Sequence, residues 1–454
     1  MRPAKQAIIL NCHTGAAFAL LLALTLLLST TAATANTALT IAEVRTRALE
    51  FNRTYLTAQE EITKANADVT KARSGALPTV TVNGLFNRNF SIPSSFVTID
   101  NETAEFKFGF KNTFGASLSA VQSIWQGGKV FTALSIAKDY RRYSEEVAGA
   151  VEANVVYQAE VLFYSVMLER ARLAVLEKSW EANTYSLDVI QKKFDQGMVS
   201  EYELLRARVE QANLKPQILQ AESNLRLSEK RLKSFLGIDL NEPVEVIEEP
   251  GDTSITRLPA LSELTSTALS ARPEMRQADY FSDITRKAVR VARADYYPSL
   301  SAIMDYSWSA QSDALTLSEN QSQSWTAGLN LSIPIFRGGR TRGAVTQAVA
   351  DHSQARLARA QTVDDIKLEV EEAYDRILQA KEALDIQGNT IAQAEKGMEI
   401  ANLRYESGVG TQLEVLSAET ALRDARRILA EALFSFRQAK AGLKKATTID
   451  LDNL

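Results

Sequence analysis

Two short acidic motifs are the candidates for chemistry in this chain. The segments Ser200 to Glu203 and Thr411 to Glu414 each place a hydroxyl residue three positions before a glutamate. This is the pattern of a capping box, in which the hydroxyl and the carboxylate each bind a backbone N–H at the start of a helix. Local capping is therefore one interpretation of Glu203 and Glu414. A gate is another, because carboxylates from symmetry-related chains would concentrate negative charge and favour cations.

Each motif follows a glycine that could end the preceding helix. Gly197 and Gly408 stand three residues before the two hydroxyl residues. Glycine adopts the left-handed conformation that commonly ends a helix. We therefore predict a tip turn at each position, with a helix arriving at the glycine and another one leaving from the acidic motif.

Few other residues could support catalysis. The single cysteine, Cys12, and one of the two histidines lie near the amino terminus, so the remainder of the chain contains only His352. This composition excludes a thiolate site and a metal site made of several histidines. His352 stands among Asp351 and Arg356, which favours a solvated helix face over membership of a triad. We expect no enzyme, no metal and no cofactor.

The overall charge also restricts the class of protein. The formal net charge is −4 in 454 residues, and no basic patch suggests a nucleic-acid partner. Residues 1–35 resemble a secretory signal peptide, with Arg2 and Lys5, an apolar stretch over 16–28 and an Ala-Thr-Ala cleavage site. An uncleaved anchor is the alternative, but this apolar stretch is short for a membrane span. The processed chain would be residues 36–454.

A strand and a very long helix must position the second tip. Residues 324–336 alternate between apolar and small polar side chains, as a strand does. Gly338 and Gly339 then end the strand, and a helical pattern without proline runs over 340–406. At about 1.5 Å per residue this helix would span roughly 100 Å.

The same pattern occurs twice in the chain. Gly127 and Gly128 precede Gly338 and Gly339 by 211 positions, and Gly197 precedes Gly408 by the same number. The sequence therefore predicts a duplicated helix–strand–strand–long helix–helix unit, with repeat one over about 40–240 and repeat two over about 260–451. A connector over about 237–272, rich in proline, links the two repeats. It would form a collar around the middle of a tube built from the long helices.

Four strands are expected, over about 78–90, 112–125, 298–308 and 324–336. One interpretation of these strands is a pair of small sheets packed on a soluble core. Alternating segments of about ten residues with aromatic ends are instead typical of transmembrane β-barrels, which we favour. The residues predicted to face lipid are Phe114, Leu118, Trp325, Leu329 and Leu331.

Four strands cannot close a barrel, and lipid does not tolerate open sheet edges. Three copies would supply twelve strands, with a backbone diameter of roughly 24 Å and an open lumen. Twelve helix positions at about 10 Å spacing would continue as a tube roughly 38 Å across. The shorter helices, 53–75 and 200–236, would stack end to end to complete the wall.

These features together resemble the TolC family of outer-membrane efflux proteins. The resemblance rests on the duplicated unit, on Arg272 to Glu274, on Ser332 to Phe336 and on Tyr405 followed by Gly408, and it covers nearly the whole processed chain. It implies a mainly α fold, in which a homotrimeric twelve-stranded barrel in the outer membrane of a Gram-negative bacterium stands on a twelve-helix periplasmic α-barrel. It also implies docking to a periplasmic adaptor and an inner-membrane pump.

The resemblance further implies an aperture at the helix tips, formed by Tyr202, Glu203, Tyr405 and Glu414. Two positions depart from the family pattern. Ser417 stands where some members have an acidic residue, and Gly410 replaces a constricting arginine. The resemblance therefore leaves the closure contacts open.

We expect a passive exit duct for small toxic compounds or drugs. An exit duct for type I protein secretion is the alternative, and the sequence hardly separates the two cargoes. A soluble periplasmic helical scaffold is a further alternative.

Overall fold

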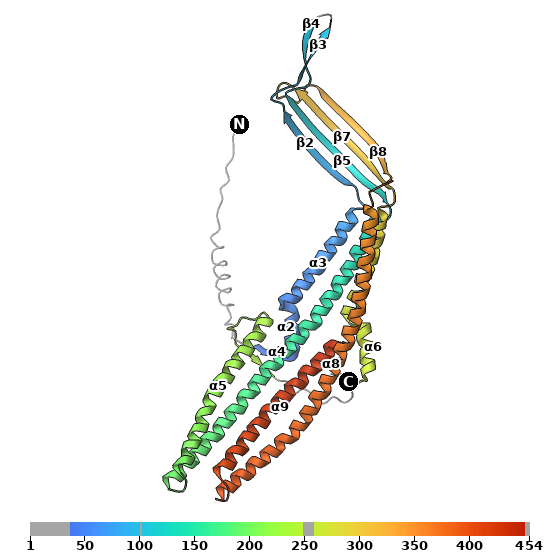
Figure 1. Cartoon of the computed structure of the whole chain (residues 1–454). Helices are drawn as coiled ribbons and strands as arrows, with labels where there is room; N and C mark the ends of the chain where they lie inside the picture. Colours follow the sequence, from blue (N-terminus) through green and yellow to red (C-terminus); the bar gives the residue numbers. More distant parts are fainter. Residues whose placement is uncertain (1–36, 100–101, 248–257, 450–454) are drawn as a thin grey trace, which may run out of the picture.

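The computed structural model describes residues 37–99, 102–247 and 258–449, so the predicted signal peptide over 1–35 lies outside the described residues. The chain is long and thin, with a β-sheet at one end and two helical hairpins at the other (Figure 1). The long helices join the two ends. This shape matches a stave of a larger assembly better than a compact domain with one central core.

The two repeats have matching elements. Those of the first are α2 (Ile41–Phe51), α3 (Arg53–Ser74), β2 (Thr79–Arg88), β5 (Asn112–Gln126), α4 (Lys129–Asp195) and α5 (Glu201–Phe235). Those of the second are α6 (Leu261–Ala271), α7 (Pro273–Ala294), β7 (Ser299–Ser312), β8 (Gln321–Ser332), α8 (Arg340–Glu406) and α9 (Gln412–Thr447). Both long helices contain 67 residues, and α8 covers the range that the sequence indicates.

The main sheet is antiparallel, in the order β2-β5-β7-β8. Its strands differ from the expected ranges by a few residues at several ends. The largest differences are in the second repeat, where β7 continues to Ser312 and β8 ends at Ser332 instead of 336. Pro334 follows the end of β8 and has no N–H for a sheet hydrogen bond, which explains the earlier end.

The connection between β2 and β5 contains a hairpin that the sequence pattern did not indicate. Strands β3 (Ser94–Ile99) and β4 (Glu102–Lys107) pair antiparallel and project beyond the main sheet (Figure 1). This connection runs over 89–111, whereas the equivalent connection of the second repeat runs only over 313–320. The polar composition of the segment hid the hairpin, since it lacks a continuous apolar face.

The main sheet has one apolar and one polar face. In register across the four strands, Val82, Leu118, Tyr306 and Trp325 lie on the same face. The next row, on the other face, consists of Asn83, Ser117, Ser307 and Ser324. All five residues predicted to face lipid lie on the apolar face, because cross-strand partners share a face.

Both faces of this sheet are open in a single chain. Val82 is 74% exposed and Trp325 is 64% exposed, although both belong to the apolar face. Aromatic pairs nevertheless form across neighbouring strands, with ring centroids 4.9 Å apart for Phe86 and Phe114 and 4.7 Å apart for Tyr306 and Trp325. An exposed apolar surface of this kind marks an interaction with lipid or protein.

Consecutive glycines form each junction between strand and long helix. Gly127 and Gly128 have φ of 60° and 78°, and Gly338 and Gly339 have φ of 58° and 81°. The second glycine of each pair is the N-cap of the long helix. Two successive left-handed residues turn the chain sharply from sheet to helix, and glycine adopts this conformation without a Cβ penalty.

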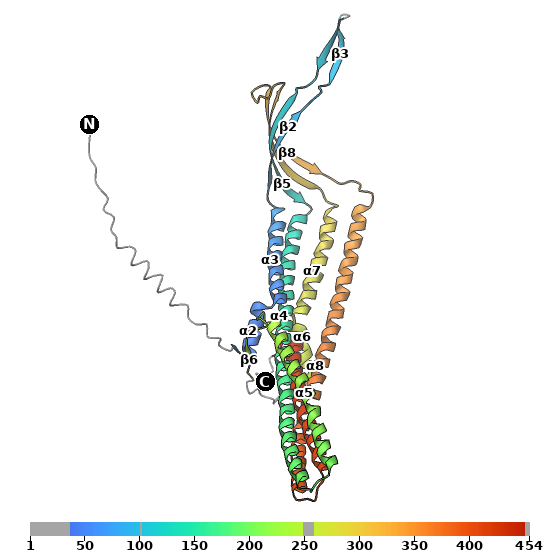
Figure 2. The ribbon, with the colours of Figure 1, turned by 90° about the vertical axis from the view of Figure 1, so that its left-hand side faces the viewer.

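The described residues form three buried apolar clusters. A small one of Ile190, Leu204 and Ala207 joins α4 to α5 near their tip, and two larger ones lie halfway along the long helices. One joins α4 and α5 to α2 and to the parallel pair β1 (Thr37–Leu39) and β6 (Val244–Val246). The other joins α6, α8 and α9, with Leu264, Phe436 and Leu443 among its fully buried members. The short elements therefore lie against the middle of the long helices (Figure 2).

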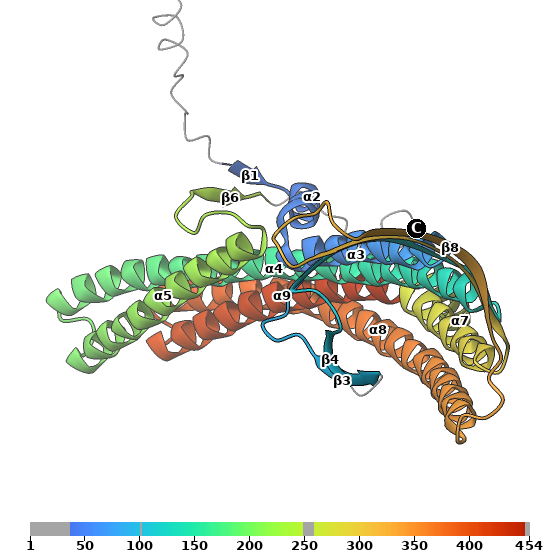
Figure 3. The same cartoon turned by 90° about the horizontal axis from the view of Figure 1, so that it is seen from above.

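Short and long helices meet end to end beside these clusters. The Asn52 side chain caps α3 through Thr54 N and donates from Nδ2 to the Phe235 carbonyl at the end of α5, at 3.2 Å. In the second repeat, buried Arg272 pairs with Glu274 at 3.0 Å and Glu369 at 2.5 Å, beside the end of α9. Through these joints α3 is followed end to end by α5, and α7 by α9. Each pair runs alongside the long helices (Figures 2 and 3).

The first testable prediction concerns the junction glycines. A Cβ at Gly127 would lie 2.8 Å from the Ala294 carbonyl oxygen, whereas a Cβ at Gly338 would meet nothing within 4 Å. Gly338→Ala should cost about 1–2 kcal/mol of stability for its left-handed backbone alone. Gly127→Ala should cost more, because the clash adds to the same backbone strain. Thermal unfolding of the two variants checks this order, and equal losses would contradict it.

Candidate functional site at the helix tips

Both long helices end in the same turn. Gly197 and Gly408 have φ of 74° and 75° and follow the last residues of α4 and α8. Met198 N donates to the Lys193 carbonyl at 2.9 Å, and Val409 N donates to the Arg404 carbonyl at 3.0 Å. Together with the glycine N–H bonds, these contacts form the Schellman arrangement that satisfies the last carbonyls of a helix.

The returning helices begin with a hydroxyl cap. Ser200 Oγ accepts from Glu203 N, and Thr411 Oγ1 accepts from Glu414 N, each at 3.3 Å. The reciprocal half of the box is replaced in the second hairpin. The Glu414 carboxylate accepts instead from Arg404 Nε, at 3.0 Å across the turn. This ion pair joins the two helices of one tip and neutralises the charge of Glu414.

A cation and an aromatic ring join the two tips. Lys193 Nζ of α4 lies 4.0 Å from the ring centroid of Tyr405 on α8. Burial, together with the negative charge of Glu203, raises the pKa of Tyr405 above its ordinary value. The Tyr405 hydroxyl is buried without a hydrogen-bond partner among the described residues. Tyr405 is therefore held at the junction of the hairpins by its ring, since cation–π attraction needs no hydrogen bond.

The four residues that the resemblance assigns to an aperture have different surroundings. Tyr405 lies between the hairpins and feels the charge of Glu203. Tyr202 is 70% exposed, and Glu414 contacts its own hairpin through Arg404. The structure thus places Tyr405 within the electrostatic influence of Glu203 of the other hairpin, whereas Glu414 belongs to a separate ion pair.

The backbone explains the glycine at position 410. A Cβ there would lie 2.9 Å from Arg404 Cβ and 3.0 Å from Tyr405 N. A side chain at this position would therefore displace the turn. The positive charges of the tips come from Lys193 and Arg404 instead.

The capping motifs do not point to Lys193 or Arg404, although the sequence contains a signal for both. The two residues are separated by the same 211 positions as the rest of the long helices, and both occupy the last helical turn. Basic residues in a last turn also complement the helix dipole. What the sequence could not indicate is that Lys193 reaches the opposite hairpin while Arg404 stays within its own.

Farther from the tips, the hairpins are joined by charged groups. Arg172 of α4 pairs with Glu431 of α9 at 2.8 Å, and Glu210 of α5 lies 3.8 Å from Arg423 of α9. We call this line of contacts between the α4–α5 hairpin and the α8–α9 hairpin the seam. Ionic contacts at partly exposed positions contribute little stability, so the seam can separate at lower cost than an apolar core.

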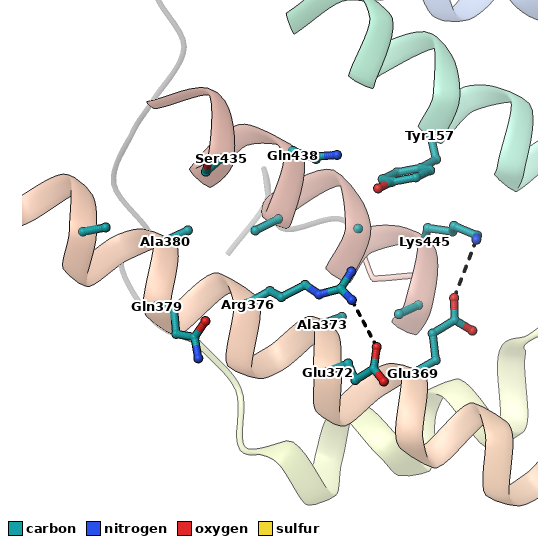
Figure 4. Close-up of a pocket in the computed structure, with 14 residues that line it drawn as sticks. Tyr157, Glu369, Glu372, Ala373, Arg376, Gln379, Ala380, Ser435, Gln438 and Lys445 are labelled. Carbon is teal, nitrogen blue, oxygen red and sulfur yellow. Dashed lines mark hydrogen bonds and ion pairs between the residues drawn. The ribbon is translucent and has the colours of Figure 1, made fainter. Parts of the chain in front are cut away.

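A groove elsewhere on the helices does not suggest a catalytic centre. It has a volume of about 570 Å³ and lies between α8 and α9, beside Tyr157 of α4 (Figure 4). Its charged residues are already paired, Arg376 with Glu372 at 3.2 Å and Lys445 with Glu369 at 3.6 Å. These pairs leave neither guanidinium nor ammonium group free of an anionic partner at the groove.

His352 is half-buried rather than solvated as expected. Its Nδ1 lies 3.2 Å from Thr285 Oγ1 on α7. That hydroxyl also contacts the carbonyls of Phe281 and Ser282, at 3.1 and 2.9 Å. The role of His352 is therefore in packing α7 against α8.

Within the described ranges, no group of three or more His, Cys, Asp or Glu could hold a metal ion. None of the helices described is long and apolar enough to cross a membrane.

Several known proteins are similar to the chain in sequence. TolC from Vibrio cholerae serotype O1 is 21% identical over 426 residues, which cover 91% of this chain and 93% of that protein. Nodulation protein T from Rhizobium leguminosarum bv. trifolii is 23% identical, covering 85% of this chain and 80% of the relative. The cation efflux system protein CusC from Escherichia coli strain K12 is 24% identical over a shorter match, 63% of this chain and 62% of CusC.

Solved structures share the fold. A crystal structure of CusC has a TM-score of 0.76 at 20% identity and covers 90% of this chain and 91% of its own. The outer membrane protein VceC from Vibrio cholerae has a TM-score of 0.74 at 17% identity, covering 90% and 95%. The sequence profile described as outer membrane efflux protein matches residues 44–238 and 264–448, one segment in each repeat. The chain therefore belongs to the outer membrane efflux protein family, with a β-sheet for the outer membrane and a long periplasmic helical part.

Proposed function

We propose that this protein is a passive exit duct for small toxic compounds or drugs, which it receives from an inner-membrane pump through a periplasmic adaptor. Three copies would build one duct. The observation that carries this proposal is the four-stranded sheet with an apolar face, a polar face and both faces open in one chain. Such a sheet is complete only when its apolar face meets lipid and its polar face lines a lumen.

The edges of the sheet support the trimer. Strands β2 and β8 are the outer strands, and each has one side without a partner in the single chain. Pairing β8 of one copy with β2 of the next repeats the four-stranded sheet around an axis. Three copies give twelve strands and roughly 24 Å of diameter, which leaves an open interior. The hairpins of the copies then converge at the other end of the tube.

The tips are where we place the aperture. Tyr405 feels the charge of Glu203 on the other hairpin, and Lys193 covers the Tyr405 ring. Tyr202 and Glu414 lie on the exposed sides of the same turns, available to neighbouring copies. Separation of the hairpins would widen this end. The protein itself performs no chemistry, and the energy for transport comes from the pump.

The names of relatives support small solutes as the cargo. CusC is named a cation efflux system protein, and the family profile is described by efflux. Type I protein secretion is the competing function, because a lumen of this size accommodates an extended polypeptide. A deletion strain tests the two together. Drug or metal sensitivity with normal secretion supports efflux, whereas missing secreted proteins with unchanged sensitivity would overturn it.

The lipid-facing assignment predicts a difference between neighbouring residues of β5. Leu118→Lys should cost about 2–4 kcal/mol in the membrane, because it places a charge on the apolar face near the middle of the strand. Ser117→Lys, on the polar face, is the matched control and should assemble normally. Heat-modifiable migration of the outer-membrane fraction measures assembly. Normal assembly of the Leu118 variant with loss of the Ser117 variant would mean that the two faces are reversed.

The aperture assignment predicts a change in ion selectivity. Glu414→Gln leaves Arg404 unpaired, so each chain gains one uncompensated positive charge at the tip. Conductance in a planar bilayer should shift away from cations, as judged by the reversal potential in a salt gradient. The double variant Arg404→Gln with Glu414→Gln keeps the net charge of the pair and should restore the original value. A single variant with unchanged selectivity would remove Glu414 from the aperture.

The contact of Lys193 with Tyr405 predicts an effect on the opening of the tips. Lys193→Gln keeps a long polar side chain but loses the charge over the Tyr405 ring. The lost contact is worth about 0.5–1 kcal/mol at a partly exposed site, a factor of two to five in an opening equilibrium. Channel open time should rise accordingly. Lys192→Gln, one residue away and paired with Asp188 on the same helix, should leave the open time unchanged.

A further inference from the structure

A carboxylate is buried in the seam between the two hairpins. Glu419 of α9 is 8% exposed and faces Asn183 of α4, which is 6% exposed. Asn183 Nδ2 donates a hydrogen bond to Glu419 Oε1 and also contacts the Ser179 carbonyl at 3.0 Å. The amide is thereby held by its own helix and aimed at the opposite hairpin. Such a contact is unusual, because asparagine and glutamate side chains are mostly exposed to solvent in folded proteins.

The charges around Glu419 do not balance it. Arg423, one turn along α9, is shared with Glu210 of α5 at 3.8 Å, and α4 contributes only the neutral amide of Asn183. Two turns along, Arg426 pairs with Glu395 of α8 at 3.3 Å. One guanidinium therefore serves two carboxylates. A buried carboxylate without its own cation is expensive in the ionised form.

Burial raises the pKa of Glu419 to about 7, with Arg423 acting to lower it and the negative charge of Glu210 acting to raise it. The neutral acid keeps its oxygen available to Asn183. In the ionised form it would repel Glu210 and require solvation. Separation of the hairpins would give water access to the group, and its pKa would return toward the ordinary value of 4.5.

We propose that Glu419 is a proton-controlled latch, neutral while α4 and α9 are joined and ionised when the α8–α9 hairpin moves away from the α4–α5 hairpin. The proposal deepens the proposed function, because the same two hairpins would form the aperture. Acid then holds the tips together, and loss of one proton per chain favours their separation.

The direction follows from proton linkage. The joined state has the higher pKa, so it binds more protons than the separated state between about pH 4.5 and 7. The ratio of separated to joined hairpins should therefore rise by up to about tenfold per pH unit in that window, and level off above it. Below the window both states are protonated, and the ratio is constant.

The ion pair of Arg172 with Glu431 should not respond in this window. Burial acts to raise the pKa of Glu431, but hydrogen bonds from Arg172 and Arg427 outweigh it, and the pKa lies below its ordinary value. Glu431 thus stays ionised where Glu419 titrates. Titration of Glu431 therefore does not account for a pH response near neutrality.

The test measures the separation of the hairpins directly. Spin labels are attached at Lys192→Cys on α4 and Ser417→Cys on α9, two exposed positions beside the seam, in the full chain with Cys12→Ser. Distance distributions are recorded from pH 4.5 to 8.5. The separated population should increase up to about pH 7 and then level off. Glu419→Gln keeps the acceptor for Asn183 but cannot ionise, so its distances should stay joined at every pH.

A matched control and a second measurement complete the test. Glu222→Gln removes a carboxylate that pairs with Arg226 on the same helix, α5, and should retain the original pH response. The infrared carboxyl band that is present in the parent protein and absent from Glu419→Gln should disappear with a midpoint near pH 7.

A parent protein whose distances do not change with pH, or a Glu419→Gln protein that responds like the parent, would overturn the latch. Neither measurement depends on conductance or cargo. Failure of the duct in planar bilayers would therefore reject the proposed function while leaving the latch intact, and the reverse result would reject the latch alone.

Discussion

Unpaired backbone groups at the edges of one small sheet set the demands on the whole molecule. Strands β2 and β8 each present a side of N–H and C=O groups without partners in the single chain. In lipid, each unsatisfied group costs several kcal/mol, so a sheet of this kind is stable there only as part of a closed barrel. In the proposed duct, the chain meets that demand as one stave of three. Its apolar face, its polar face and its open edges all follow from that incompleteness.

The same incompleteness explains the helical part. A wall one helix thick cannot enclose a single large core, so the buried side chains gather in separate clusters. The two larger ones lie where α2 and α6 pack on the long helices, and a small one lies inside the α4–α5 hairpin. Away from those clusters the wall depends on end-to-end joints. Asn52 and Arg272 occupy equivalent positions in the two repeats and make these joints by different means, an amide cap and a buried ion pair.

The consequence for function is an uneven distribution of stability along the molecule. The sheet is held by a continuous ladder and the middle by apolar clusters, whereas the seam near the tips is polar. Lys193, Glu419 and Arg172 each reach across it to a residue of the opposite hairpin. Elements that must move are drawn from the less stable regions of a protein. The polar seam places that region at the narrow end of the proposed duct.

The sequence by itself determined the duplicated unit, the limits of α8 and the alternation of faces in each strand, because helix and strand periods and glycine turns are local properties. It did not determine the β3–β4 hairpin, the pairing of Arg404 with Glu414, or the burial of Glu419 against Asn183. Arg404 and Glu414 are only ten positions apart, but they meet because the tip turn brings two helices side by side. The contact of Glu419 with Asn183 depends on how helices more than 200 residues apart in the chain align along the seam. A shift of one residue in that alignment would move each side chain by about 100° around its helix axis, and only the tertiary structure decides it.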